Sequence, residues 1–323
     1  MSNTGIYLLA IISSIVLTTI IMPFYIKALK KHHANQSVSE YALDSYKKKE
    51  KTPIMGGLIF VMIPVIVYLL INPNRFSNPL VNFVILSYIS FCFVGFFDDI
   101  LVILKNNNDG LTPRFKLVLE CLITIVLFFI FKNDLSFSID IPFINGGIQV
   151  SPIIFMPFMV LLFAAEANAV NFTDGMDGLC AGVSIIALIV FAIIAYKCSE
   201  MNLLLLIISI IGGLIGYLFF NFHPAKIFMG DSGSLALGAL FSAIAVSLNK
   251  EVALFFIGGV FVLEMFCVCL QLLSVKLFHK RVFSYTPIHY AFVLKGNKEV
   301  KVVLFFYLAE LLLALIGLFI GLN

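Results

Sequence analysis

Four short polar segments interrupt an otherwise apolar chain, and each carries residue types that can bind a metal ion or a phosphate group. They are GFFDDI (Asp98 and Asp99), NAVNFTDGMDG (Asn168, Asn171, Asp174, Gly175 and Asp177), FNFHPAKIFMGDSGSL (Phe228 and Asp231) and PIHYAFVLKG (His289). Carboxylates outnumber histidines in these segments, and oxygen ligands suit Mg²⁺ or Mn²⁺ better than zinc. We therefore expect a magnesium-type site, with Mn²⁺ as the alternative ion.

Asp98 and Asp99 are adjacent carboxylates at the end of an apolar run. Two ionised carboxylates repel each other, and near a membrane this is costly unless a metal ion or a basic side chain offsets the charge. The alternative is a pair of solvated acids at a helix end, which needs no partner. The other three segments favour the metal.

Asp174 and Asp177 lie three residues apart, a spacing that would place them on one face of a helix. Gly175 and Gly178 permit tight turns and close approach of a ligand, while an aspartate before LCAGVSIIAL could also cap a helix. In GDSGS, Asp231 could bind a metal while the serines cap the next helix, although an ordinary turn is the alternative. A helix N-terminus beside a carboxylate-bound cation would suit a pyrophosphate.

The elements that must position these residues are membrane helices. Of the 323 residues, 61% are hydrophobic and 12% are charged, which excludes an ordinary soluble domain. Each span needs roughly 20 apolar residues, so the chain has room for about ten spans in a single domain, residues 1–323. The apolar runs predict spans near residues 4–29, 54–72, 79–97, 115–131, 153–170, 179–197, 201–219, 234–248, 252–278 and 301–322.

The distribution of positive charge predicts the orientation. Most of the 21 Lys and Arg residues fall in the connections after odd-numbered spans, so these connections face the cytoplasm and both termini lie outside. The four polar segments then all lie at cytoplasmic ends of spans and could share one site. Residues 135–150, with Asn145-Gly146 at the centre, predict a small external β-hairpin. The long ninth span should be kinked or broken around Gly258 and Gly259.

At these segments the chain resembles the polyprenyl-phosphate N-acetylhexosamine-1-phosphate transferase family. Its members carry a DD pair, an NxxNxxDGxDGL segment and a GDxGSLxLG segment in this order, and here they read FFDDI, NAVNFTDGMDGL and GDSGSLALG. The resemblance extends from TPIMGG, which begins at Thr52, to LKG, which ends at Gly296, and is strongest to the branch that uses UDP-MurNAc-pentapeptide. That branch usually has three consecutive histidines where this chain has His289, Tyr290 and Ala291, so only His289 can be carried over.

The resemblance implies an all-α enzyme of the bacterial inner membrane. It would transfer phospho-MurNAc-pentapeptide from UDP-MurNAc-pentapeptide to undecaprenyl phosphate with Mg²⁺, giving lipid I and UMP for peptidoglycan synthesis. The implied catalytic residues are Asp98, Asp99, Asp231 and His289, and the implied metal ligands are Asp231 and Asp174. The implied substrate contacts are Lys48, Thr52, Lys116, Asn168, Asn171, Asp174, Gly175, Asp177, Phe228 and Gln271.

Partners and competing functions follow from the same observations. Membrane lipid and both substrates are expected partners, a homodimer stays open, and a net charge of +3 gives no reason to expect nucleic acid. The missing histidines keep UDP-GlcNAc or another UDP-HexNAc open as the substrate. A cation-coupled transporter is a further alternative, because intramembrane acids often mark ion paths. Against it, the acids gather at one membrane face and no internal repeat is evident.

Overall fold

The computed structural model describes residues 3–32, 34, 52–74, 76–105, 110–142 and 147–323. Lys48 and the Asn145-Gly146 pair lie outside the described residues. The helices are α1 (Asn3–Lys31), α3 (Gly57–Ile71), α4 (Pro79–Lys105), α5 (Pro113–Phe131), α6 (Pro152–Thr173), α7 (Leu179–Lys197), α8 (Met201–Asn221), α9 (Asp231–Leu248), α10 (Glu251–Ile257), α11 (Gly259–Phe278), α12 (Ile288–Leu294) and α13 (Glu299–Leu322). Two short strands are β1 (Ser138–Ile139) and β2 (Ile148–Gln149).

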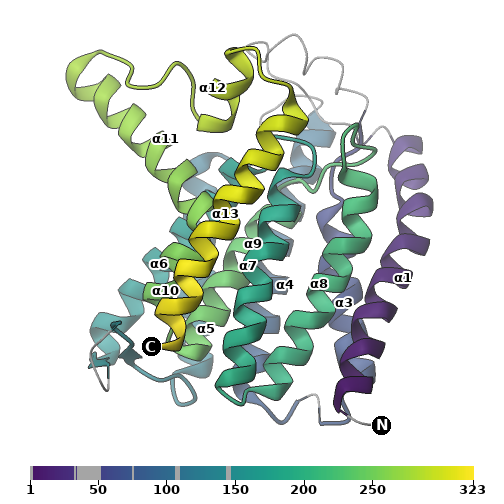
Figure 1. Cartoon of the computed structure of the whole chain (residues 1–323), viewed down its shortest axis with the longest axis vertical. Coiled ribbons are helices and arrows are strands. Elements are labelled where there is room, and N and C mark those ends of the chain that lie inside the picture. The colour runs from purple at the N-terminus through teal and green to yellow at the C-terminus, as the bar shows by residue number, and fades with distance from the viewer. Residues whose placement is uncertain (1–2, 33, 35–51, 75, 106–109, 143–146) are drawn as a thin grey trace.

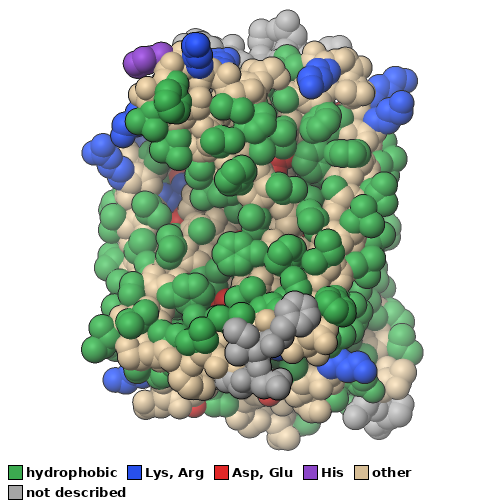
Figure 2. Space-filling model, turned by 60° about the vertical axis from the view of Figure 1, so that its left-hand side comes forward, with side chains coloured by type: hydrophobic (Ala, Val, Ile, Leu, Met, Phe, Trp, Pro, Cys, Tyr) green, Lys and Arg blue, Asp and Glu red, His purple; other side chains and the backbone are tan. Residues whose placement is uncertain are grey.

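Eight helices in the described part of the chain are long and apolar enough to cross a membrane: α1, α4, α6, α7, α8, α9, α11 and α13. The chain is therefore a multi-pass membrane protein. Figure 2 shows hydrophobic side chains across the middle of one face, with Lys and Arg mostly toward its two ends. The other two predicted spans correspond to α3, with only 15 residues, and to α5, which carries Arg114, Lys116 and Glu120 near its start.

Helix α9 lies at the centre of the bundle. Every residue from Ser232 to Leu248 is buried, as expected for a helix that is small or apolar on all sides. Glycines on neighbouring helices allow this close packing: a Cβ at Gly95 of α4 would collide with the backbone of Asp231, and one at Gly57 of α3 would collide with Gly233. The start of α9 is therefore held tightly between α3 and α4.

Figure 1 shows both termini at one end of the bundle, and α12 at the other end. Helix α11 leans away from the bundle and leads to α12, while α13 returns along the bundle. Strands β1 and β2 pair antiparallel, Ser138 with Gln149 and Ile139 with Ile148, at the end that holds the termini. The pair falls within the segment predicted as a hairpin, whose central turn lies outside the described residues.

Three boundaries bear on the site. The predicted break of the ninth span is confirmed, because α10 ends at Ile257 and α11 begins at Gly259. The predicted end of the third span at residue 97 is wrong: α4 continues to Lys105 because the residues after the acidic pair, ILVIL, remain apolar. The predicted start of the eighth span at residue 234 is also wrong, because α9 begins at Asp231 with Gly230 as its N-cap.

Candidate active site

Lys116 joins two of the four polar segments. Its ammonium group forms an ion pair with the Asp231 carboxylate and lies 3.9 Å from Oδ1 of Asp98. Lys116 lies in the first turn of α5, where the Thr112 side chain caps the helix by accepting a hydrogen bond from the Phe115 N–H. A capped helix start holds the lysine at a defined place between α4 and α9.

Asn171 brings the second polar segment to the same carboxylate. Its Nδ2 donates hydrogen bonds to Oδ1 of Asp231 at 2.7 Å and to the Ser234 hydroxyl at 2.9 Å. Both Asp231 oxygens are therefore bound by protein groups, Oδ1 by an amide and Oδ2 by an ammonium group. The expected convergence of Asp98, Lys116, Asn171 and Asp231 is present.

Asp99 has a different environment from its neighbour. Its carboxylate is buried and accepts hydrogen bonds from the backbone N–H groups of Asp231, at 3.0 Å, and Ser232, at 3.1 Å. These are unsatisfied amides at the positive end of a helix, and a carboxylate there is stabilising. Asp99, and not the serines of GDSGS, therefore caps α9, and it fixes the position of Asp231.

Asp98 faces the start of α5. Its Oδ1 accepts a hydrogen bond from the Leu111 N–H at 2.9 Å and lies near Lys116. Successive residues of a helix point about 100° apart, which separates the two adjacent carboxylates and lets each find its own partner. A shared metal ion is thus not needed to hold Asp98 and Asp99 together.

Glu120 is a member of this site that sequence reasoning did not single out. It is fully buried, its Oε2 accepts a hydrogen bond from Nδ2 of Asn168 at 2.9 Å, and its Oε1 has no hydrogen-bond partner within the described ranges. Glu120 lies four residues after Lys116, so the two share a helix face. The spacing of Lys116 and Glu120 in the sequence was the signal that could have identified Glu120. Asn168 is thus placed beside Glu120, one turn away from Asn171.

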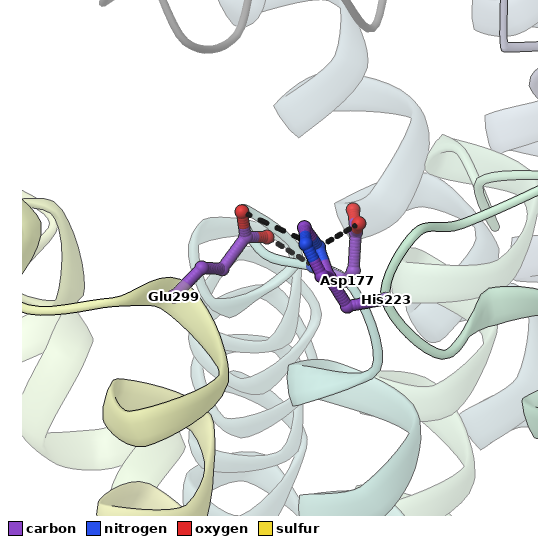
Figure 3. A group of neighbouring side chains, drawn as sticks. All are labelled: Asp177, His223 and Glu299. Carbon is purple, nitrogen blue, oxygen red and sulfur yellow. Dashed lines mark hydrogen bonds and ion pairs between the residues drawn. The ribbon is translucent and has the colours of Figure 1, made fainter.

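Asp177 anchors three separate segments (Figure 3). Its Oδ2 accepts hydrogen bonds from the Ala225 N–H at 3.1 Å and from Nδ1 of His223 at 2.9 Å, while its own N–H donates to Oε1 of Glu299 at 2.9 Å. Asp177, His223 and Glu299 offer ligand atoms within 4.8 Å of one another, so this group could hold a metal ion. The Asp177 side chain is 1% exposed.

The prediction that Asp174 and Asp177 share a helix face is wrong. Helix α6 ends at Thr173 with Asp174 as its C-cap, and α7 begins only at Leu179, so both acids lie in the intervening turn. The residue before α7 is Gly178, whose φ of 80° is readily adopted only by glycine. The Asp177 carboxylate therefore binds His223 and Ala225 instead of capping α7.

The TPIMGG segment lies beside the GDSGS segment. The Pro53 carbonyl accepts a hydrogen bond from the Phe228 N–H at 2.9 Å, and the Gly56 N–H donates to the Phe228 carbonyl at 2.8 Å. The Gly57 N–H donates to the carbonyl of Met229 at 2.9 Å. This backbone pairing places Pro53, which follows Thr52 in the sequence, next to Phe228, three residues before Asp231.

The last two predicted residues lie on α11 and α12. His289 is fully buried, and its Nδ1 lies 3.0 Å from Oε1 of Glu264. The Gln271 side chain accepts hydrogen bonds from the N–H groups of Val282 and Phe283 and donates to the Phe283 carbonyl. Gln271 therefore holds the connection between α11 and α12, which does not favour its predicted substrate contact.

The chemistry of the group around Asp231 suits a hard divalent cation. Asp98 and Asp231 offer carboxylate oxygens there, the ligand type that Mg²⁺ prefers. Two acids share one lysine there, so a cation beside Asp231 would meet an excess of negative charge. The same lysine could bind a phosphate oxygen.

Comparisons with known proteins agree with this chemistry. Residues 81–249 match the model of glycosyl transferase family 4. The phospho-N-acetylmuramoyl-pentapeptide-transferase of Staphylococcus saprophyticus is 42% identical over 325 residues, covering 98% of this chain and 100% of the relative. The enzymes of the same name from Staphylococcus carnosus and from Staphylococcus aureus strain bovine RF122 are 39% and 41% identical, covering 98% and 96% of this chain and 100% and 98% of theirs.

Proposed function

Because this chain belongs to the phospho-N-acetylmuramoyl-pentapeptide transferases of glycosyl transferase family 4, we propose that it transfers phospho-MurNAc-pentapeptide from UDP-MurNAc-pentapeptide to undecaprenyl phosphate. The products are lipid I, a precursor of peptidoglycan, and UMP. The observation that carries the proposal is the meeting of Asp98, Lys116, Asn171 and Asp231 at one end of the bundle. Two anionic phosphates must approach each other there, and the site combines a cation with metal-binding oxygens.

Asp231 and Asp174 are the residues proposed to hold Mg²⁺. Asp231 fits because its carboxylate lies at the start of α9, is partly exposed, and shares Lys116 with the carboxylate of Asp98. Asp174 is the C-cap of α6, three residues after Asn171, which itself touches Asp231. When bound, Mg²⁺ would neutralise phosphate charge and stabilise the departing UMP.

Asp98 and Lys116 are proposed to serve the lipid phosphate. A phosphate monoester is mostly ionised near neutrality, since its second pKa is about 6, so Asp98 does not need to be a strong base. An oxygen of the lipid phosphate then attacks the phosphorus that bears the sugar, and the bond from that phosphorus to the UMP oxygen breaks. Lys116 offsets the charge of the approaching phosphates. We favour this direct attack over a covalent aspartyl intermediate.

The nucleotide is proposed to bind at the Asp174–Asp177 turn, beside Phe228. The Asp174 carboxylate and the Gly175 backbone would contact it, and the Phe228 ring would stack on uracil. Asp177, which is buried, would act by holding the turn through His223 and Ala225. Thr52 lies next to the residue that pairs with Phe228, and Lys48 precedes Thr52 in the sequence, so both belong to the same proposed subsite.

The topology proposed for this activity has ten crossings, with α3 and α5 added to the eight long apolar helices and α10 and α11 forming one broken span. Both termini would lie outside and the site would face the cytoplasm, where the nucleotide sugar is made. The bias of Lys and Arg toward the odd-numbered connections supports this orientation.

The test is UMP release by the purified protein with UDP-MurNAc-pentapeptide and with UDP-GlcNAc, each with and without undecaprenyl phosphate. Release only with the pentapeptide substrate and the lipid supports the proposal. Release with UDP-GlcNAc would favour the second candidate, which Tyr290 and Ala291 in place of histidines make worth testing. No release with any pair of substrates would contradict both.

A further inference from the structure

Glu264 is a buried carboxylate that the proposed reaction does not use. It lies on α11, is fully buried, and accepts hydrogen bonds only from the start of α12 among the contacts that the structure describes. Oε2 accepts from the Ile288 N–H at 2.6 Å, and Oε1 accepts from the His289 N–H at 3.2 Å and faces its Nδ1 at 3.0 Å. One side chain thus fixes both the backbone and the imidazole of His289.

These contacts determine which ring nitrogen of His289 carries the proton. Both oxygens of Glu264 already accept backbone N–H groups of α12, and a carboxylate oxygen that faces an imidazole nitrogen acts as the acceptor. Nδ1 must therefore carry the hydrogen that it shares with Glu264. In the neutral ring this leaves a lone pair on Nε2, the other nitrogen.

Nε2 of His289 is buried and has no hydrogen-bond partner in the described part of the chain. It points at Gly175, where an added Cβ would collide with Nε2 and would lie 2.7 Å from the Tyr290 hydroxyl. Nε2 therefore packs directly against Gly175, and only glycine allows this approach. Buried polar atoms without partners are rare and are often explained by a ligand.

Tyr290 already binds a neighbouring acceptor at this turn, the carbonyl of Gly175. Its hydroxyl donates to the Gly175 carbonyl at 3.1 Å, so that carbonyl is already bound. Burial, and to a smaller degree the nearby Asp174 carboxylate, raises the pKa of Tyr290, which keeps the hydroxyl protonated as a donor. A donor group of a ligand bound at the Gly175 turn would therefore find Nε2 available as an acceptor.

We propose that Glu264 is a positioning residue, which holds His289 in the Nδ1–H form so that Nε2 accepts a hydrogen bond from a hydroxyl or N–H group of the nucleotide sugar at the Gly175 turn. This inference rests on the proposed function, because it places the nucleotide sugar at that turn. His289 is the residue that touches the substrate, and Glu264 acts through it. Glu264 also links α11, which leans away from the bundle, to the site.

The test replaces Glu264 with glutamine and measures binding of UDP-MurNAc-pentapeptide by calorimetry without lipid. Glu264→Gln replaces one of the two accepting oxygens with an NH₂ donor, so at least one of the three hydrogen bonds from the start of α12 is lost and His289 is held less firmly. We expect nucleotide-sugar affinity to fall about tenfold, as for one lost hydrogen bond to a buried group, and equally in His289→Gln. The double variant should be no weaker than His289→Gln, because both changes remove the same contact.

The matched control is Glu310→Gln. Glu310 is also a fully buried glutamate that accepts a backbone N–H, from Val260, but it does not touch α12 within the described residues. The affinity of the Glu310→Gln variant for the nucleotide sugar should stay within about twofold of wild type. Equal loss in Glu310→Gln would mean that replacing any buried glutamate disturbs the site, and would overturn the inference.

Nitrogen NMR of isotope-labelled histidine tests the ring form directly and needs no variant that might fail to fold. Wild-type His289 should carry its hydrogen on Nδ1; a hydrogen on Nε2 alone would overturn the inference. Wild-type affinity in Glu264→Gln would overturn it as well. A wild-type protein that neither binds UDP-MurNAc-pentapeptide nor releases UMP would instead contradict the proposed function.

Discussion

Lys116 stands between two carboxylates that would otherwise repel each other. Asp231 and Asp98 both face its ammonium group, and neither acid is fully exposed. The attraction between a cation and two anions at this spacing is larger in a partly buried site than in water. Lys116 therefore holds the two acids close together, which prepares the proposed site for phosphate groups. Each acid can be tested separately because each has its own further partner.

Asp231→Asn should lower kcat by about 100-fold or more, because one charge is removed from the proposed metal site without a change of shape. The dependence of the remaining activity on Mg²⁺ concentration should weaken. UMP release across a Mg²⁺ titration measures both effects. The unfolding temperature should stay near that of the wild type, since the asparagine can still bind Asn171. Turnover close to wild type would show that Asp231 does not belong to the proposed site.

Asp98→Asn should lower kcat by about 100-fold while the affinity for UDP-MurNAc-pentapeptide, measured by calorimetry without lipid, stays near wild type. Asp98, on α4, faces the start of α5 and not the Asp174–Asp177 turn, so we assign it to the proposed lipid subsite. The comparison variant is Asp174→Asn, which should instead lose about 1 to 3 kcal/mol of nucleotide-sugar binding. Equal losses of affinity in the two variants would contradict this division.

At the scale of elements, the contact between α4 and the start of α9 places the acidic residues. Asp99 on α4 caps α9, and Gly95, one turn earlier, allows the two backbones to touch. The same contact brings Asp98 and Asp231 to the same lysine, Lys116. A small change in this packing should therefore affect stability and turnover together.

Gly95→Ala tests that contact. The added methyl group would collide with the backbone of Asp231, which cannot move aside as a side chain can, and we expect a loss of about 1 to 3 kcal/mol in stability together with reduced turnover. The control is Gly321→Ala on α13, whose methyl group would meet the end of the flexible Ile194 side chain. The unfolding temperature and the rate of UMP release are measured for both variants. Equal losses in Gly95→Ala and Gly321→Ala would show that the close approach of α4 to α9 is unimportant.

At the scale of the whole molecule, the two ends of the bundle differ in kind. One end holds both termini and the β1–β2 pair, and the other holds α12 and the polar segments that form the site. Because the proposed reaction joins a soluble nucleotide sugar to a lipid phosphate, the proposed site at the second end would lie at a membrane surface. Its orientation in the membrane can be measured without any activity assay.

Cysteine labelling tests the orientation. Cys198, exposed after α7, should react with a membrane-impermeant reagent from outside the cell, whereas Lys295→Cys, after α12, should react only when the cytoplasmic face is opened. Single-cysteine variants made from a protein with the other cysteines replaced by serine separate the two signals. Labelling of Lys295→Cys in intact cells would reverse the proposed topology.

The sequence by itself determined the class of molecule and the members of most of the site. Long apolar runs allow only membrane helices, and carboxylates next to glycines at their ends are expensive in a membrane without a function, so Asp98, Asp231 and Asn171 could be predicted to converge. Local pattern also predicted the break at Gly258. Tertiary structure alone decided what each polar side chain touches. Asp99 caps α9, Asp177 binds His223, and Gln271 holds a loop. Glu120 and Glu264 contact predicted site residues from positions that looked like ordinary helix interior. The physical reason is that a carboxylate's role depends on the donors within about 3 Å of it, and these come from segments that are distant in the sequence.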